Sequence, residues 1–128
     1  MGMKETYAAV QKAVEAKDFD ELRRHIADDF VMLEPEPLPY GGEWRGPEGF
    51  VALVQKLRES FGIDVVKSQI SEAEGDLLVC EFTFGFTSLR TGERMEQAVI
   101  DLFRFDQDGK IARADIYYTD AVKLAAIA

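Results

Sequence analysis

One carboxylate interrupts an otherwise apolar stretch of the chain. Asp101 lies inside AVIDLFRF (98–105). A strand alternates its side chains between two faces, so Asp101 would share a face with Val99, Phe103 and Phe105. An unpaired buried charge is very costly, so such a group is hydrogen-bonded, neutralised or facing a cavity. Apolar neighbours would raise its pKa and turn it from a hydrogen-bond acceptor into a donor. The pattern predicts an acid that faces a cavity.

Two further carboxylates lie near the end of a short apolar segment. Glu34 closes FVMLE (30–34) and directly precedes Pro35, and Glu36 lies in the loop that follows. From the residues alone, Glu34 and Glu36 are compatible with solvated carboxylates at a rim, and Asp101 with a structural hydrogen bond.

Other site chemistries find little support in the residue types. His25 is the only histidine and is expected on the surface of a helix, which argues against a histidine-based metal site or catalytic triad. No glycine-rich loop with a lysine suggests phosphate binding. The single cysteine, Cys80, excludes an intramolecular disulfide and favours a reducing compartment. We expect no metal and no cofactor.

Charge and length limit the partners. The net charge of −9 argues against nucleic acid and anionic membranes, since both attract basic proteins. No apolar run reaches the roughly 18 residues that a membrane helix needs, and the first residues lack the apolar core of a signal peptide. We expect one cytoplasmic domain over residues 1–128.

The residue periodicity changes halfway along the chain. Apolar residues at helical spacing predict helices over 4–16, 18–29 and 48–61, with a short strand at 30–34. From about residue 63 the period becomes two. Three strands joined by short Asp/Gly turns, an antiparallel meander, are predicted over 77–89, 94–105 and 111–118. This order predicts an α+β fold in which a curved antiparallel sheet wraps around three N-terminal helices, with a pocket between the two layers.

Several side chains are candidates for the pocket wall. Phenylalanines alternate on one face of the 77–89 strand and either fill a core or line a cavity for an apolar ligand. Gln97 lies on the same face as Asp101, and Tyr40 and Trp44 flank a glycine-rich turn at the expected pocket mouth, as a cover for a ligand or as a lid packed on the core. The candidate ligand-binding residues from the strands and this turn are therefore Tyr40, Trp44, Phe82, Phe84, Phe86, Gln97 and Phe103.

Three segments resemble a known family. They are AKDFDELRRHIADDFVMLEP (16–35), YGGEWRGPEGFVALVQKL (40–57) and VIDLFRFDQDGKIARADIYY (99–118). In this order they resemble the ketosteroid isomerase-like, or SnoaL-like, branch of the nuclear transport factor 2 (NTF2-like) superfamily. The resemblance implies a cone-shaped fold with an internal pocket, and that superfamily uses one pocket for many tasks.

The resemblance also implies roles for individual residues. Glu34 falls where ketosteroid isomerases keep the general base, and Asp101 where they keep a protonated acid that hydrogen-bonds to the developing oxyanion. Glu36 is the alternative for the base, and we prefer Glu34 because it ends a predicted strand and directly precedes Pro35.

Tyr118 takes the place of a pocket aromatic. Val10 stands where the isomerases have an oxyanion-hole tyrosine, so it is expected at the ligand but cannot donate a hydrogen bond. Tyr7, one turn earlier on the same helical face, is the candidate replacement.

Two functions follow as expectations. In the first, the protein is an isomerase or cyclase that transfers a proton on a small apolar substrate of carbonyl type. In the second, it is a non-catalytic ligand-binding or dimerisation module. The resemblance further implies a homodimer, and the outer sheet face with Val79, Ile100 and Leu102 is the candidate interface.

Overall fold

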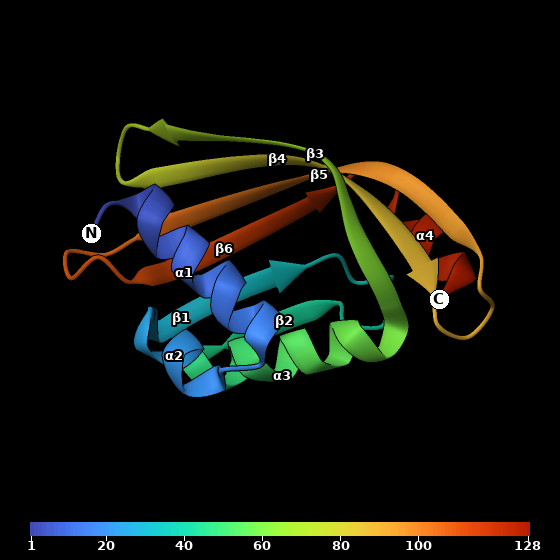
Figure 1. Ribbon diagram of the computed structural model, residues 1–128, viewed down its shortest axis with the longest axis horizontal. Helices are drawn as coiled ribbons and strands as arrows, with labels where there is room; N and C mark the ends of the chain where they lie inside the picture. Colours follow the sequence, from blue (N-terminus) through green and yellow to red (C-terminus); the bar gives the residue numbers. More distant parts are fainter.

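The computed structural model describes residues 1–128 and shows helices packed against a curved, unclosed sheet of six strands (Figure 1). The strand order is β2-β1-β6-β5-β4-β3, and every neighbouring pair is antiparallel except β1 with β6. The α+β fold predicted from the sequence is confirmed. The elements are α1 (Met3–Ala16), α2 (Phe19–Arg24), β1 (Ile26–Glu34), β2 (Gly42–Arg45), α3 (Gly46–Ser60), β3 (Phe61–Ala73), β4 (Leu77–Ser88), β5 (Arg94–Phe105), β6 (Ile111–Tyr118) and α4 (Ala121–Ile127).

The second helix is shorter than its sequence pattern predicts. Asp18 caps it, since its Oδ1 accepts a hydrogen bond from the Glu21 backbone N–H at 3.2 Å. The predicted helix over 18–29 is wrong beyond Arg24, because Ile26 already pairs with Ile111 of β6 and begins β1. Apolar spacing alone could not reveal this boundary, because Ile26 is buried whether it continues a helix or begins a strand.

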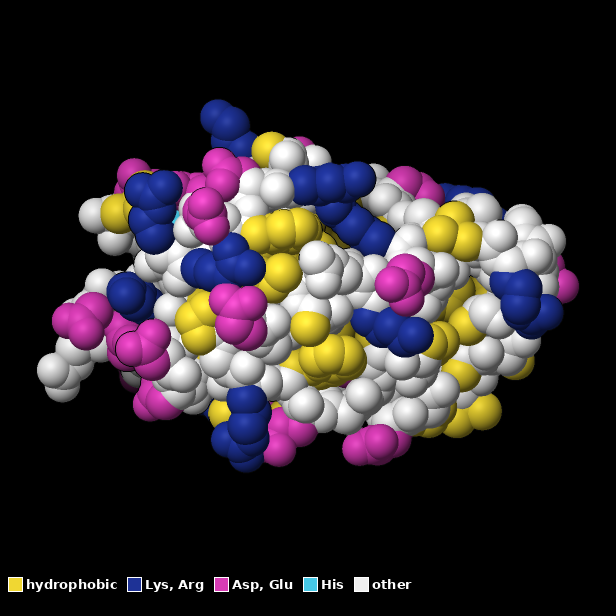
Figure 2. All heavy atoms as spheres, turned by 90° about the horizontal axis from the view of Figure 1, so that it is seen from below, with side chains coloured by type: hydrophobic (Ala, Val, Ile, Leu, Met, Phe, Trp, Pro, Cys, Tyr) yellow, Lys and Arg dark blue, Asp and Glu magenta, His cyan; other side chains and the backbone are white.

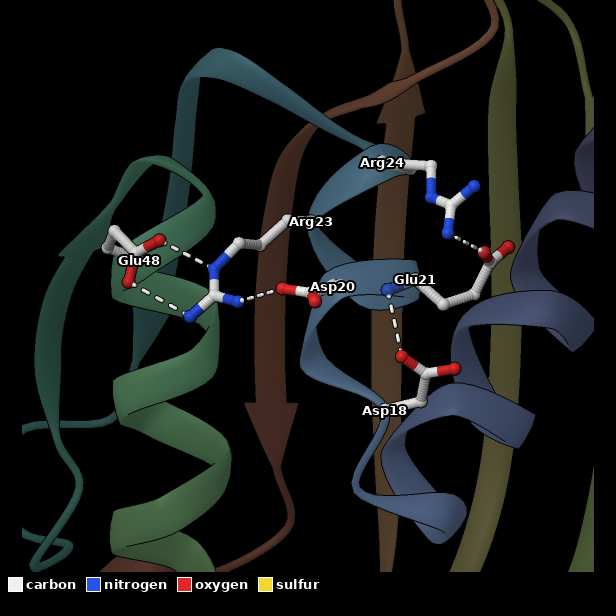
Figure 3. Close-up of polar contacts among 6 residues, drawn as sticks. All are labelled: Asp18, Asp20, Glu21, Arg23, Arg24 and Glu48. Atoms are coloured by element: carbon white, nitrogen blue, oxygen red, sulfur yellow. Dashed lines mark hydrogen bonds and ion pairs between the residues drawn. The ribbon is translucent and has the colours of Figure 1, made fainter.

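Surface ion pairs connect α2 with the start of α3. Arg23 of α2 reaches Glu48 at the start of α3, with Nε to Oε1 at 2.6 Å, and also contacts Asp20 at 2.9 Å (Figure 3). Both carboxylates are exposed, so the network contributes little to the free energy of unfolding. His25, predicted at the surface, is largely covered and its Nε2 lies 2.9 Å from Glu21 Oε1.

The third helix begins at a glycine that needs a left-handed backbone. Gly46 has φ of +69°, a conformation that residues with a Cβ rarely adopt, and Pro47 follows in the first turn. Phe50, Leu53 and Val54 form the buried stripe of α3, which packs on β1. This stripe places α3 along one side of the concave sheet face (Figure 1).

A fourth helix closes the chain and was not predicted from the sequence. Asp120 caps α4 through a hydrogen bond from the Lys123 N–H to Oδ1 at 2.9 Å, and Leu124 is fully buried. Gln97 of β5 fixes the start of this helix: its Oε1 accepts from the Asp120 N–H and its Nε2 donates to the Asp120 carbonyl, both at 3.1 Å. None of the four helices has the length and apolar character that crossing a membrane requires.

The predicted meander is confirmed in β4, β5 and β6. Asp101 of β5 lies between Cys80 of β4 and Ile116 of β6. The inward residues of these strands are mostly buried, whereas Ile100 and Leu102 lie partly exposed on the outer face. Val79, the third residue of the predicted interface, is also partly exposed there, and the homodimer stays a prediction.

Candidate active site

A cavity of about 460 Å³ lies between the concave face of the sheet and helices α1 and α3. It is lined by 23 residues, of which 17 are hydrophobic, and its size is typical of sites for small organic ligands. β4 supplies an aromatic wall. The rings of Phe82 and Phe84 stack with centroids 4.5 Å apart, and Phe86 meets Phe84 edge-on at 5.9 Å. The predicted inward face of this strand is thus confirmed.

The two candidate carboxylates lie on inward positions of β1 and β5, the two strands on either side of β6. Asp101 pairs with Ile116 of β6, and Leu33 of β1 pairs with Asp115, so Glu34 falls one residue further along, beside Ile116. One strand therefore separates Glu34 from Asp101, which puts their Cα atoms about 10 Å apart at the usual strand spacing. Both side chains line the cavity and point into the same space.

Neither carboxyl group is fully paired. Glu34 Oε1 and Asp101 Oδ1 are buried and have no hydrogen-bond partner in the protein. Buried polar atoms are nearly always satisfied in folded proteins, because an unmet acceptor costs about 1–3 kcal/mol. Two orphaned oxygen atoms in one cavity therefore indicate a site shaped for a ligand rather than for stability. Glu36, the alternative to Glu34, is exposed and does not line the cavity.

Burial alters the acidity of both groups. It raises the pKa of Asp101 from 3.8 to about 7, since the ionised form loses its hydration there. It also raises the pKa of Glu34 well above its usual 4.5, and the negative charge of Asp101 raises it further. Both shifts favour the protonated forms, and the two carboxyl groups titrate as a coupled pair.

Three tyrosine hydroxyls lie close to the acids. Burial raises the pKa of Tyr7, Tyr40 and Tyr118, so all three hydroxyls keep their protons. The Tyr40 and Tyr118 hydroxyls bond to each other at 2.8 Å. Tyr7 lines the cavity, its ring lies 5.3 Å from Phe103, and no protein group hydrogen-bonds to its hydroxyl. Tyr7 is therefore available to donate to a ligand.

The structure gathers most of the predicted site residues at this cavity. Eight of them line it: Tyr7, Glu34, Phe82, Phe84, Phe86, Asp101, Phe103 and Tyr118. The other four predicted residues do not line it. Val10 is packed in the core, and Gln97 is engaged by Asp120. Tyr40 is fully buried behind Tyr118, and the Trp44 indole N–H donates to the Tyr40 carbonyl at 3.0 Å, so neither covers the mouth.

The mouth of the cavity contains residues that the sequence reasoning missed. α1, α3 and β3 form it, with Glu15, Arg58 and the partly exposed Ile63 and Val65 among the lining. Seen from the α3 side, apolar side chains reach the surface among basic and acidic ones (Figure 2). A signal existed for Arg58: it follows Val54 by four positions and so lies on the apolar stripe of α3.

Comparisons with known proteins identify the family. The model of the SnoaL-like domain family matches residues 6–114. No curated protein matches the chain. Among solved structures, an NTF2-like protein from Burkholderia xenovorans LB400 is similar over 98% of this chain and 94% of its own, with a TM-score of 0.89 and 20% identity.

Two further structures carry functional descriptions. A candidate polyketide cyclase from Pseudomonas putida KT2440 is similar over 100% of this chain and 99% of its own, with a TM-score of 0.80 and 20% identity. TerC, co-crystallised with polyporic acid, has a TM-score of 0.80 and 21% identity over 98% of this chain and 96% of its own. At these identities the similarity shows a shared NTF2-like fold and no more.

Proposed function

The chain belongs to the SnoaL-like family, within the NTF2-like superfamily, and from this premise we propose that its cavity binds a small apolar carbonyl compound on which Glu34 and Asp101 transfer a proton. The observation that carries the proposal is the pair of unpartnered, buried carboxyl groups in an otherwise apolar cavity. The description of a fold relative as a candidate polyketide cyclase agrees with this chemistry.

The proposed step needs one ionised and one protonated carboxyl group. The ionised group takes a proton from the carbon next to the substrate carbonyl, and the electron pair of that C–H bond moves onto the carbonyl oxygen. The protonated group donates a hydrogen bond to this oxygen, as does Tyr7, and both stabilise the enolate. Return of the proton to another carbon gives an isomer, and attack of the enolate carbon on a second carbonyl of the same molecule closes a ring.

Two assignments of the roles are open to test. The family resemblance implies Glu34 as the base and Asp101 as the acid. The reverse assignment is the alternative, because burial raises the pKa of both groups and their mutual repulsion acts on each alike, so it does not select which one ionises first. We propose the assignment that the resemblance implies, and the experiments below distinguish it from the reverse.

Exchange of α-protons in D2O tests the proposal without knowledge of the natural substrate. The probe is 2-tetralone, an apolar bicyclic ketone, and NMR follows the loss of its α-proton signal. We expect Glu34→Gln and Asp101→Asn each to lower the protein-catalysed exchange rate at least about 100-fold, with affinity for the ketone changed only a few-fold. The control Glu36→Gln, outside the cavity, should keep the wild-type rate. Unchanged exchange in both cavity variants would refute proton transfer by this pair.

The pH profile of the exchange rate separates the two assignments. If Asp101 is the base, the wild-type rate rises with pH through about 7, where Asp101 ionises, and Asp101→Asn abolishes this rise. If Glu34 is the base, Asp101→Asn retains a rise with pH, and the rise starts at lower pH because the charge of Asp101 no longer opposes ionisation of Glu34.

The alternative function is a ligand-binding module without catalysis. The absence of a hydrogen-bond donor at Val10 favours it, since the oxyanion would lack one partner that the isomerases have. In that case 2-tetralone binds, its α-protons exchange no faster than in buffer, and the carboxyl substitutions alter affinity alone. Binding measured beside exchange thus decides between the two functions.

A further inference from the structure

The polar residues of the cavity divide into two groups. Glu34 and Asp101 lie deep, against the sheet, while the remaining polar side chains come from α1, α3 and β3 at the mouth. Among all 23 lining residues one is basic, Arg58. The polar lining of the mouth consists of Gln11, Glu15, Arg58 and Ser68.

Arg58 lacks the partner that most arginines of this chain have. Its Nη2 donates to the backbone carbonyl of Val14 on α1, and no carboxylate lies within ion-pair distance. A guanidinium has five N–H groups, so most of its donors have no partner in the protein. By contrast, five of the eight arginines pair with a carboxylate: Arg23, Arg24, Arg45, Arg94 and Arg113. In a chain with 24 acidic residues, an unpaired arginine at a cavity mouth is unusual.

The position of Arg58 fits a fixed anion-binding group. The side chain is partly buried, and its bond to Val14 spans the mouth from α3 to α1, so the guanidinium is already oriented before a ligand arrives. Apolar neighbours reduce the competition from water, which strengthens a charge-assisted hydrogen bond. Arginine also matches a carboxylate or sulfonate with two parallel N–H bonds.

We propose that Arg58 binds an anionic group at the outer end of the ligand, so that the cavity selects an apolar carbonyl compound that also carries a carboxylate. This inference rests on the proposed function, because it assumes an apolar ligand in the same cavity. The acids near the sheet repel an anion, and Arg58 attracts it. The ligand is therefore oriented with its carbonyl group toward Glu34 and Asp101 and its charge at the mouth.

A matched pair of fluorescent dyes tests this directly. 1-Anilinonaphthalene-8-sulfonate is anionic, and N-phenyl-1-naphthylamine has the same ring system without the sulfonate. Titrations of the full chain compare the wild type, Arg58→Met, Arg58→Lys and the control Arg104→Met. Arg104 is exposed on the outer sheet face, so its loss changes the net charge equally without touching the cavity.

We expect Arg58→Met to lower the affinity for the sulfonate dye at least about 10-fold and to change the affinity for the neutral dye less than about twofold. Arg58→Lys should recover part of the lost affinity, because it restores the charge without the two-pronged geometry. Arg104→Met should leave both dyes unchanged.

Several results would contradict the inference. An equal loss of affinity for both dyes in Arg58→Met would overturn it and leave Arg58 as a tether between α1 and α3. An unchanged affinity of Arg58→Met for the sulfonate dye would overturn it as well. If Arg58→Met fails to fold, Arg58→Lys takes its place, and its affinity for the sulfonate dye must fall more than its affinity for the neutral dye. Binding of neither dye to the wild type would overturn the apolar cavity and the proposed function together, whereas binding of the neutral dye alone overturns only the role of Arg58.

Discussion

The cavity has a closed end against the sheet and an open end at the α1, α3 and β3 rim, and charged groups lie in opposite environments at the two ends. At the closed end, Glu34 and Asp101 have buried oxygen atoms without partners, and burial raises both pKa values. At the open end, Arg58 and Glu15 lie near solvent, and apolar side chains such as Val65 remain 59% exposed. The unfavourable electrostatics are thus concentrated where the proposed proton transfer needs a donor and an acceptor.

In the proposed function, the closed end is the site of reaction and the open end the site of ligand selection. A carboxyl group keeps a raised pKa only where water cannot hydrate its ionised form, as at the buried position of Asp101 on the sheet. A group that recognises a ligand on entry needs access instead, which the α1, α3 and β3 rim provides. Substitutions should therefore have large effects at the closed end and small effects at the rim.

The largest effect is expected from the aromatic packing of the closed end. Phe86 is fully buried against Phe61 and Tyr118, with centroid distances of 5.6 and 5.8 Å. Phe86→Ala should lower the free energy of unfolding by about 4 kcal/mol, because it removes a buried ring and enlarges the cavity. Val65→Ala at the rim should lower the free energy of unfolding by less than about 1 kcal/mol. Urea unfolding measures both, and equal losses would contradict the comparison.

The next effect is a gain in stability. The folded state holds a proton on Asp101 up to about pH 7, whereas the unfolded state releases it near pH 3.8. Between these values the folded state binds more protons, so its stability falls as pH rises through that range. Asp101→Asn removes this loss and should stabilise the protein by roughly 2 kcal/mol at pH 8, with little change at pH 4.

Urea unfolding of wild type and Asp101→Asn at both pH values checks this prediction. Glu34 titrates in both proteins and is relieved of the Asp101 charge in the variant, so the difference between them reports Asp101 together with its coupling to Glu34. A variant that is less stable than wild type at pH 8 would show that Asp101 is ionised and well paired in the folded state, and the comparison between the two ends would fail.

A smaller effect is expected from the hydroxyl pair behind the cavity. Tyr40→Phe removes the 2.8 Å bond to Tyr118 and should lower the free energy of unfolding by about 1 kcal/mol. Tyr117→Phe is the control, since its ring points outward and is 58% exposed. Thermal unfolding that gives the same change for both variants would mean that the Tyr118 hydroxyl finds an equivalent partner when the Tyr40 hydroxyl is lost.

The smallest effect is expected at the rim. Glu15→Gln should change the free energy of unfolding by less than about 0.5 kcal/mol, since Glu15 is exposed and makes no ion pair. Its effect should also be the same at pH 6 and pH 8. A pH-dependent change, measured by urea unfolding, would show that the electrostatic influence of the acidic pair extends to the mouth.

The sequence by itself determined the features that depend on local periodicity. The alternation around Asp101 placed it on the inward face, and the same rule put Phe82, Phe84 and Phe86 on one wall, because strand side chains must alternate. Turn residues at short spacing predicted the meander, whereas Glu34 was singled out by the family resemblance and preferred to Glu36 because it ends a strand.

Only the tertiary structure decided features that depend on contacts between distant segments. The end of α2 is set by the pairing of Ile26 with Ile111, and Tyr40 is buried because Tyr118 lies across from it. Arg58 lies at the cavity mouth, held by the Val14 carbonyl, because α1 packs opposite it in the fold. Periodicity records which way a side chain points from its own element, whereas burial, partners and acidity depend on what the rest of the chain brings opposite to it.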